Sequence, residues 1–423
     1  MSAVHADTAH DLFQSHLSEC SGLLEDPKGS GRQFVVSKKG KSQWLKDHCD
    51  FDSYMAEWKT AIENHTNISF PTIRHFFYLA YEAGVLFEKL PQPKTIPDGG
   101  LIWRHEPNWC ICFSPEEKKA FISSTNSEVE LDMLESWVVT PSTSQVSQSK
   151  YSVAVEVPQS NYQSAVEKVR EYIAQGDIFQ ANVARFWQSN FDEEPLNALY
   201  DKLREVNPAP FAAFLKAGNL TIISASPERL FSIDESGHVA ARPIAGTRKR
   251  SEGDKDQALS DELLLSEKER AEHIMLVDLE RNDLGRVCVP GSIHVDECMV
   301  IEKYATVQHI VSNVVGTLEK NIDLLDVIKS MFPGGTITGC PKVRCMEIIH
   351  ELEPNARGPY TGGIGYMAWD GSVDMNILIR TFWQWQGKLK WAAGAGIVAD
   401  SVSEYEEIET EHKVAGLMRA FND

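Results

Sequence analysis

Closely spaced runs of apolar and β-branched residues, separated by turn residues, place the strongest constraint on the fold of this chain. Residues 211–215 (FAAFL) and 220–226 (LTIISAS) are joined by Lys-Ala-Gly-Asn, and residues 230–233 (LFSI) and 238–246 (HVAARPIAG) are joined by Asp-Glu-Ser-Gly. Gly and Asn readily adopt the backbone angles that tight turns require, so such short connections join antiparallel neighbours. The sequence therefore predicts two β-hairpins in the middle of the chain.

Helical segments alternate with further strands along the rest of the chain. Residues 160–175 carry apolar side chains at helical spacing after a Ser and a Gln three residues apart, and Gly176 ends the pattern. We interpret the run 71–90 (PTIRHFFYLAYEAGVLFEKL) as a buried helix followed by a loop. Residues 375–385 and 389–398 are again typical of strands. The pattern predicts an α/β or α+β fold with much antiparallel sheet.

A polar stretch between residues 138 and 152 is rich in Ser and Thr and shows no apolar periodicity. Such a composition is typical of a linker or a long surface loop. We therefore predict an N-terminal accessory region over residues 1–145 and a main domain over residues 150–423. With 423 residues, 42% of them hydrophobic, the chain can bury the core of one large or two medium domains.

The overall charge narrows the choice of partners. The formal net charge is -20, from 61 acidic and 41 basic residues, which argues against DNA or RNA because phosphate backbones repel acidic surfaces. The first residues lack the basic and apolar parts of a signal peptide, and no apolar run approaches the roughly 18 residues of a membrane span. We expect a cytoplasmic protein that does not bind membranes.

One predicted helix carries a pair of glutamates close to its start. Ser266 and Glu269 form a capping-box pattern, which predicts that the helix begins at this serine. Glu272 lies three residues beyond Glu269 and therefore shares its face of the helix.

A second predicted helix, near the C-terminus, carries the same arrangement in Glu406 and Glu409. Beside this pair, an apolar stripe is formed by Tyr405, Ile408, His412 and Ala415. If the two helices face one another, their carboxylates offer the hard oxygen ligands that Mg²⁺ prefers. Alternatively, each pair belongs to a solvated surface, and Glu269 only caps its helix.

Residues 332–342 (FPGGTITGCPK) form a glycine-rich segment. Its three glycines permit close backbone approach to an anion, while Thr336 and Thr338 supply hydroxyl groups and Lys342 a positive charge. The segment is not a Walker loop, because Cys340 and Pro341 precede the lysine where a glycine should stand. The alternative is a tight structural turn.

Further polar residues lie in surroundings rich in predicted strands. Arg380 lies within the apolar run 375–385 and needs a partner, and a substrate carboxylate suits the geometry of its guanidinium. Each of the others is, taken alone, more typical of a structural residue. They are Gln180, Asn182, Glu228, Thr247, His309 and Tyr360.

Seven motifs taken together resemble the chorismate-utilising family, which includes anthranilate, aminodeoxychorismate, isochorismate and salicylate synthases. They occur in the family's order and cover most of residues 150–423. In this chain they are RPIAGT, AEHIMLVDLERNDLGRV, FPGGTITGCPKVRCMEII, RGPYTGGIGY, IRTF, GAGIVADS and EYEEIETEHK. The resemblance implies an α/β domain in which two antiparallel sheets pack face to face with helices outside, and an active site in a cleft beside the core.

The resemblance also implies roles for the candidate residues. Glu272 and Glu409 resemble direct ligands of Mg²⁺, supported by Glu269 and Glu406, and the ion would act as a Lewis acid on the ring carboxylate. Glu228 resembles the general acid that protonates the departing C4 hydroxyl. The remaining candidates are Tyr360 and Arg380 at the enolpyruvyl carboxylate, Gly394 and Gly396 at the ring carboxylate, and Gln180, Thr247, His309 and Thr336 in the same pocket.

Gln180 stands where the isochorismate and salicylate synthases carry a lysine that activates water. An amide cannot activate water, so the resemblance favours ammonia as the nucleophile. Within the aminating branch, five features resemble the enzymes that form aminodeoxychorismate. They are Asn182, the second glycine of FPGG, the segment NPAPFAAFL, the short chain and Leu23-Leu24-Glu25-Asp26. The branch implies a separate glutamine amidotransferase subunit that supplies ammonia, and in relatives the N-terminal region binds tryptophan.

Ala245 departs from this pattern, because many enzymes that form aminodeoxychorismate carry there a lysine that adds covalently to C2. Alanine cannot act as a nucleophile. Either ammonia adds first at C2 and a second addition follows at C4, or the product is the 2-amino compound and the chain resembles an anthranilate synthase. We favour the first, because a subset of the 4-aminating enzymes resembles this chain in having alanine.

Overall fold

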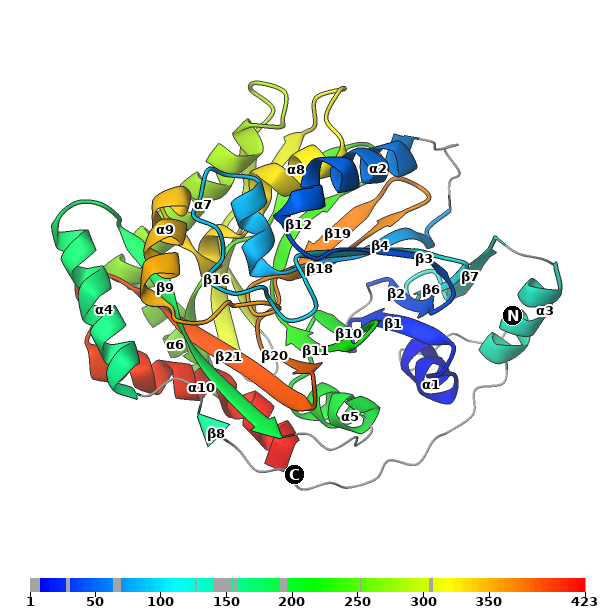
Figure 1. Cartoon of the computed structure of the whole chain (residues 1–423). Coiled ribbons are helices and arrows are strands. Elements are labelled where there is room, and N and C mark those ends of the chain that lie inside the picture. The colour runs from blue at the N-terminus through cyan, green and yellow to red at the C-terminus, as the bar shows by residue number, and fades with distance from the viewer. Residues whose placement is uncertain are drawn as a thin grey trace.

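The computed structural model contains two large antiparallel sheets with helices around them (Figure 1). It describes residues 8–27, 31–63, 70–125, 128–139, 154–155, 159–190, 196–251, 253–303 and 307–422. The fold class predicted from the sequence is confirmed.

Within the described residues the first sheet has eleven strands. They are β1 Cys20–Glu25, β2 Gln33–Ser37, β6 Trp109–Ser114, β7 Lys119–Ser124, β8 Ala154–Val155, β9 Gln180–Asn190, β10 Phe211–Ala217, β11 Leu220–Ser226, β17 Gly339–Cys340, β20 Thr381–Trp385 and β21 Lys388–Ile397. Their order is β17, β9, β21, β20, β11, β10, β1, β2, β6, β7, and β8 also pairs with β9.

The second sheet has ten strands in the part of the chain that the structure describes. They are β3 Gly40–Leu45, β4 Ile73–Leu79, β5 Ile102–Pro107, β12 Arg229–Ile233, β13 His238–Ala241, β14 Ile244–Lys249, β15 His294–Lys303, β16 Val307–Thr317, β18 Gly363–Ala368 and β19 Val373–Asn376. Their order is β14, β16, β13, β12, β19, β18, β4, β5, β3, and β15 also pairs with β16.

The described helices lie outside this pair of sheets. The α-helices are α1 Thr8–Ser15, α2 Phe51–Glu63, α3 Glu128–Val139, α4 Gln159–Ala174, α5 Leu196–Val206, α6 Asp254–Leu265, α7 Glu267–Gly285, α8 Leu324–Met331, α9 Lys342–Leu352 and α10 Ser403–Asn422. Three 3₁₀ helices are η1 His48–Asp50, η2 Tyr81–Leu86 and η3 Gly335–Ile337.

Apolar side chains fill three layers. The central layer joins the two sheets face to face: Phe34 and Ile222 of the first sheet lie in one buried cluster with Phe76 and Ile364 of the second. A second cluster packs α1, α5 and α10 on the outer face of the first sheet. A third packs α2, α8 and α9 on the outer face of the second sheet. The central strands of each sheet therefore bury both of their faces, as adjacent apolar layers require.

Both sheets contain strands from the N-terminal part of the chain. β1 pairs with β10 in the first sheet, and β4 pairs with β18 in the second. Residues 138–152, where the sequence places the domain boundary, lie outside the described residues except for 138 and 139. Strands that precede this segment and strands that follow it are thus hydrogen bonded to one another in both sheets.

The two predicted hairpins are present. β10 and β11 are antiparallel, and the pairing of Ala217 with Leu220 leaves a two-residue turn in which Gly218 has a φ of 61°. β12 and β13 form the second hairpin. The run 238–246 is not one strand, however. Pro243 lacks a backbone N–H, and the chain leaves β13 to enter β14 on the other side of β16.

The helix predicted over residues 71–90 is wrong. This segment forms strand β4 and the 3₁₀ helix η2, and all seven residues of β4 are buried. A strand covered on both faces shows a continuous apolar run without alternation, so its pattern resembles that of a buried helix. Two phenylalanines, a tyrosine and an isoleucine in β4 are the β-favouring residues that could have decided the question.

Candidate active site

The start of helix α7 brings two of the predicted carboxylates to the edge of the first sheet. Ser266 caps the helix as predicted, since its hydroxyl accepts a hydrogen bond from the backbone N–H of Glu269. Glu272 follows on the next turn and accepts a hydrogen bond of 2.9 Å from Nε2 of Gln180 on β9. Burial and the neighbouring Glu269 raise the pKa of Glu272, whereas the Gln180 bond lowers it.

Helix α10 carries the other two carboxylates. Burial and the charge of Glu409 raise the pKa of Glu406. The side chain of Glu409 is 50% exposed and forms an ion pair of 2.7 Å with Nζ of Lys413, one turn further along the helix.

The apolar stripe predicted for α10 is wrong. Its members Tyr405, Ile408, His412 and Ala415 are all exposed. The helix buries instead the face that contains Glu407, Thr410, Val414, Leu417 and Phe421. Polar residues occupy this face because they have specific partners: Gln163 donates a 2.7 Å hydrogen bond to Glu407, and Arg185 donates a 2.9 Å hydrogen bond to Thr410.

The two glutamate pairs lie in the fields of the same two cations. Lys268 and Lys413 both lower the pKa of Glu272 on α7 and that of Glu406 on α10. No three of the four carboxylates have oxygen atoms within 4.8 Å of one another, the four glutamates all being described residues. The helices thus bring both pairs to one region, with Glu272 held by Gln180 and Glu409 held by Lys413.

Glu228 is a buried carboxyl group at the start of β12. It is 7% exposed, and burial raises its pKa to about 7, although Thr336, Lys413 and Arg380 oppose this rise. Oγ1 of Thr336 donates a 2.6 Å hydrogen bond to Oε1 of Glu228. A carboxyl group with this pKa can donate a proton near neutral pH.

The glycine-rich loop presents Thr336 to Glu228 from the 3₁₀ helix η3. A Cβ atom on Gly335 would lie 2.3 Å from a methyl carbon of Leu279 on α7, so only glycine allows the loop to approach this helix. The loop continues into β17, where Gly339 pairs with Ala181 of β9. The loop is thus fixed between α7 and the edge of the first sheet.

Strand β21 contributes two glycines that leave room for side chains of β9. A Cβ atom on Gly394 would lie 2.3 Å from Oδ1 of Asn182 and 2.9 Å from the hydroxyl of Tyr360, and one on Gly396 would lie 2.4 Å from Nε2 of Gln180. Among the described residues, the buried Oε1 of Gln180 and Oδ1 of Asn182 have no hydrogen-bond partner. Buried acceptors of this kind favour a ligand or water that donates hydrogen bonds.

Arg380 lies close enough to both Glu228 and His309 for its charge to interact with each of them. Arg380 has a φ of 51°, and burial lowers the pKa of its guanidinium while the charge of Glu228 raises it. Burial lowers the pKa of His309 to about 4, so the imidazole is neutral at pH 7, and its Nδ1–H donates to the carbonyl of Gly246 at 3.1 Å. A neutral imidazole can donate or accept a hydrogen bond without adding charge.

Strand β14 brings the motif RPIAGT to the start of α7. Thr247 pairs in register with His309, and Ala245, which is buried, pairs with Ile310. A Cβ atom on Gly246 would lie 2.8 Å from Oε2 of Glu269. The backbone around Ala245 is therefore adjacent to both the predicted metal ligands and His309.

Sequence reasoning assigned no role to Lys413, which the structure places among these groups. Its Nζ donates a 2.9 Å hydrogen bond to the carbonyl of Gly394, and its charge lowers the pKa of Glu228. Its position four residues after Glu409 was a signal, since this spacing places a cation on the same helical face.

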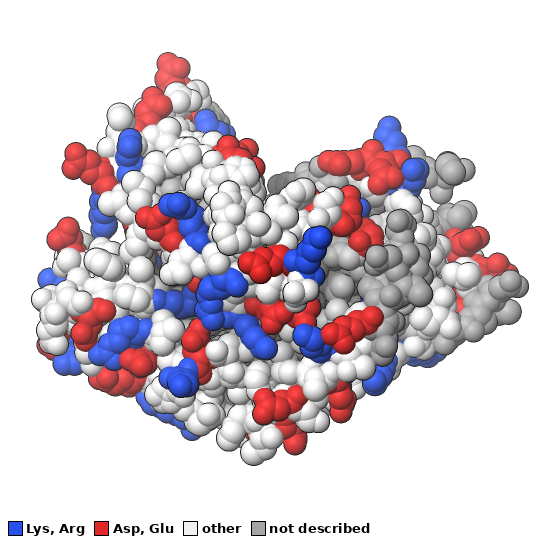
Figure 2. Space-filling model, turned by 90° about the horizontal axis from the view of Figure 1, so that it is seen from above, with Lys and Arg blue, Asp and Glu red and all other residues white. Residues whose placement is uncertain are grey.

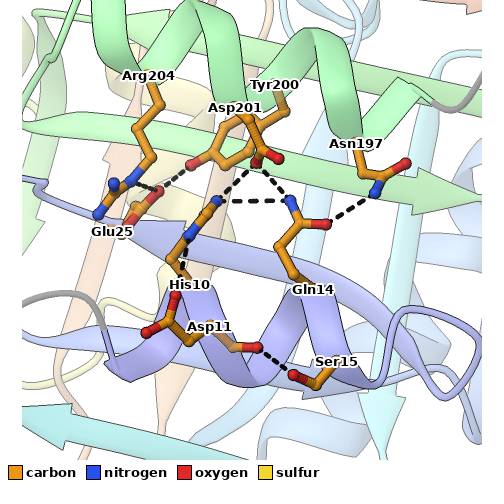
Figure 3. A network of polar contacts seen from close by, with 9 residues as sticks. All are labelled: His10, Asp11, Gln14, Ser15, Glu25, Asn197, Tyr200, Asp201 and Arg204. Atoms are coloured by element: carbon orange, nitrogen blue, oxygen red, sulfur yellow. Dashed lines mark hydrogen bonds and ion pairs between the residues drawn. The ribbon is translucent and has the colours of Figure 1, made fainter. Parts of the chain in front are cut away.

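Glu25 of the segment Leu23–Asp26 lies next to helix α5 (Figure 3). Oε1 of Glu25 accepts hydrogen bonds from the hydroxyl of Tyr200 at 2.5 Å and from Nε of Arg204 at 2.9 Å. Nε2 of His10 lies 2.7 Å from a carboxylate oxygen of Asp201. This network joins α1, β1 and α5.

The surface carries mixed charges. On the face shown in Figure 2, Lys and Arg side chains are interspersed with Asp and Glu, and the surface is hollowed between two lobes. None of the helices in the described ranges combines the length and apolar composition needed to cross a bilayer.

A sequence profile described as chorismate binding enzyme matches residues 21–419. The chain therefore belongs to the chorismate-binding enzyme family. It is 40% identical to aminodeoxychorismate synthase component 1 of Bacillus subtilis (strain 168), over 92% of this chain and 86% of that protein. It is also 40% identical to anthranilate synthase component 1 of Saccharolobus solfataricus, over 81% of this chain and 79% of that protein.

Solved structures share the fold. Anthranilate synthase component I from Streptococcus pneumoniae superposes with a TM-score of 0.81 at 28% sequence identity, covering 91% of this chain and 92% of that one. The menaquinone-specific isochorismate synthase MenF from Escherichia coli superposes with a TM-score of 0.76 at 19% identity, covering 99% and 92% of the two chains. The family predicted from the seven motifs is confirmed.

Proposed function

We propose that this chain aminates chorismate at C4 with ammonia to form 4-amino-4-deoxychorismate, a precursor of para-aminobenzoate. The observation that carries the proposal is the geometry around β9: Gln180 bridges to Glu272 on α7, and the buried acid Glu228 lies beside Arg380 and Lys413. These groups supply an acid, cationic partners for substrate carboxylates and a cluster of carboxylates within one site.

The donor set of α7 and α10 fits Mg²⁺. In each pair, burial and the charge of the other glutamate raise the pKa of one member, Glu272 on α7 and Glu406 on α10, so a divalent cation would relieve this repulsion. Glu272 and Glu409 would bind the ion, and Glu269 and Glu406 would support them. The side chain of Glu409 is half-exposed and could exchange its ion pair with Lys413 for a bond to the metal. When bound, Mg²⁺ would polarise the ring carboxylate of the substrate.

Gln180 supports ammonia rather than water as the nucleophile. Its Nε2 donates to Glu272, and its buried Oε1 has no partner among the described residues, so it offers an acceptor but no base. Water needs a base to become a competent nucleophile, whereas neutral ammonia does not. Glu228, protonated near neutral pH, supplies the proton with which the C4 hydroxyl leaves as water.

The second candidate function differs in the position of the new amino group, which is C2 rather than C4. Ala245 is buried beside the site and cannot add to C2. This is consistent with addition of ammonia at C2 as the C4 hydroxyl leaves as water, followed by addition of a second ammonia at C4 as the first leaves C2. If ammonia remains at C2 and pyruvate is eliminated, the product is anthranilate, and several relatives are named anthranilate synthases. The 92% coverage of the aminodeoxychorismate synthase relative supports the first product.

The products distinguish these candidates directly. The protein is incubated with chorismate, Mg²⁺ and an ammonium salt, with and without an aminodeoxychorismate lyase. We expect chorismate to be consumed in both incubations. Para-aminobenzoate should form only in the incubation that contains the lyase. Fluorescence of anthranilate that grows without lyase would refute the choice of product.

The metal assignment has its own test. Glu272→Gln and Glu409→Gln should lose activity and weaken binding of Mn²⁺, measured by electron paramagnetic resonance as a substitute for Mg²⁺. Glu267→Gln, an exposed glutamate of α7, is the matched control and should bind Mn²⁺ as the wild type does. Unchanged Mn²⁺ binding in both site variants would remove these glutamates from the metal site.

We also propose that a separate glutamine amidotransferase subunit supplies ammonia in vivo. The name of the Bacillus subtilis relative, component 1, supports a second component. Added glutaminase subunit should make glutamine an effective nitrogen donor, while the isolated chain should use only ammonium salts.

A further inference from the structure

Arg357 is 1% exposed and uses its whole guanidinium for hydrogen bonds. Nε and Nη2 donate to the two carboxylate oxygens of Glu353 at 2.8 and 2.7 Å. Nη2 also donates to the carbonyl of Asn182 at 2.7 Å, and Nη1 donates to the carbonyl of Ile337 at 2.9 Å. Its fork geometry therefore links one carboxylate to two backbone carbonyls from distant parts of the chain.

The first of these carbonyls lies on the edge of β9 between the residues paired with β17 and those paired with β8, where no strand of the described residues covers it. Strand β17 pairs only with Gln180 and Ala181, and the backbone N–H of Asn182 donates to Thr338 beyond it. Further along this edge, Arg357 binds the carbonyl of Asn182, and Oε1 of Glu353 accepts from the N–H of Ala184 at 2.9 Å. The ion pair thus takes the place of a neighbouring strand next to Gln180.

The second carbonyl belongs to the glycine-rich loop. Ile337 directly follows Thr336, whose hydroxyl binds Glu228. Arg357 also lies next to Tyr360: its carbonyl accepts from the backbone N–H of Tyr360 at 3.2 Å, and its guanidinium carbon lies 5.8 Å from the centre of the tyrosine ring. One side chain therefore contacts all three segments that carry Gln180, Thr336 and Tyr360.

We propose that Arg357, held by Glu353, is a positioning residue for the reaction. It fixes β9 and the glycine-rich loop relative to one another. Because Gln180 of β9 binds Glu272 and Thr336 of the loop binds Glu228, this constraint sets the distance between the acid Glu228 and the carboxylate Glu272. This inference rests on the proposed function of these groups. Its consequence is that loosening Arg357 should slow the chemical step more than it weakens substrate binding.

Arg357→Lys tests this role. Lysine keeps the charge but offers three donors from a single point, so it cannot hold both carbonyls and Glu353 in the same geometry. We expect kcat to fall by about 10- to 100-fold, the size of effect that a small misplacement of reacting groups produces, with KM for chorismate changed by less than about threefold. Arg104→Lys is the matched control, because Arg104 is also buried (2% exposed) but binds Gln43 on β3.

The pH profile separates positioning from general loss of structure. The hydrogen bond from Thr336 lowers the pKa of Glu228, so a loop that drifts from Glu228 should move the high-pH limb of kcat to higher pH. A merely structural role would reduce the folded fraction and kcat in proportion and leave the high-pH limb of kcat in place. That result would overturn the proposal, and so would an equal loss of kcat in Arg104→Lys.

A second variant covers the case in which Arg357→Lys does not fold. Glu353→Gln keeps an oxygen that can accept from the N–H of Ala184 and leaves the bonds of Arg357 to both carbonyls, but it removes the charge that holds Arg357. It should fold, bind chorismate and show a loss of kcat, whereas wild-type kcat in this variant would refute positioning. If wild type and Arg104→Lys both fail to consume chorismate, the proposed function is wrong and this role falls with it.

Discussion

Replacing Glu228 by glutamine should lower activity and raise stability at the same time. Glutamine has nearly the same shape and can still accept the hydrogen bond of Thr336, but it carries no proton to donate. Loss of a general acid typically lowers kcat by about 10²- to 10⁴-fold, which corresponds to about 3–5 kcal/mol of activation free energy. Chorismate binding should change little, because the variant keeps Arg380 and Tyr360.

The expected gain in stability follows from the pKa of this group. Burial raises it from 4.5 to about 7, so the folded state favours the protonated form, and the wild type loses free energy of unfolding as pH rises between these values. The difference corresponds to about 3 kcal/mol above pH 7. Glu228→Gln removes this cost, so the variant should be as stable as the wild type near pH 4 and more stable at pH 8.

Two assays check this pair of effects. Urea unfolding at pH 5 and pH 8 gives the free energy of unfolding, and chorismate consumption from pH 5.5 to 9 gives the rate. Wild-type kcat should fall as pH rises through about 7, because the acid must be protonated, while the residual rate of Glu228→Gln should lack this limb. Glu235→Gln, an exposed residue in the same hairpin, is the control. Retention of more than about a tenth of wild-type kcat would contradict the role of Glu228.

Three further perturbations follow from the site and the network in Figure 3. Thr336→Val removes the donor that lowers the pKa of Glu228, so the high-pH limb of kcat should move to higher pH in the same rate assay. Gly396→Ala pushes Nε2 of Gln180 away from Glu272, so about 10-fold more Mg²⁺ should be needed for the half-maximal rate. An unchanged Mg²⁺ titration would argue against a role of the Gln180–Glu272 hydrogen bond in metal binding. Tyr200→Phe leaves a buried oxygen of Glu25 with one partner fewer and should cost about 1–3 kcal/mol in urea unfolding without changing kcat.

The sequence determined the features that depend on neighbouring residues. Gly218 and Gly237 have positive φ angles in the turns of both predicted hairpins, and Ser266 caps α7 where its capping-box pattern predicted. Turn and cap preferences act over a few residues, so a single sequence displays them. The seven motifs also gave the family, because they preserve side chains whose spacing is fixed by a shared fold.

The tertiary structure decided which faces are buried and which distant groups meet. β4 is a strand because β18 and β5 cover its two edges and apolar layers cover both its faces, a fact that the run 71–90 does not contain. α10 buries Glu407 and Thr410 because Gln163 and Arg185, on neighbouring elements, donate hydrogen bonds to them.

The site shows the same division. Thr336 donates a hydrogen bond to Glu228, 108 residues away. Arg357 joins the carbonyl of Ile337, 20 residues away, to that of Asn182, 175 residues away. The residue types were readable from the sequence, but their pKa values and partners were not. Burial and long-range pairing set those properties, and both arise only when remote strands and helices come into contact.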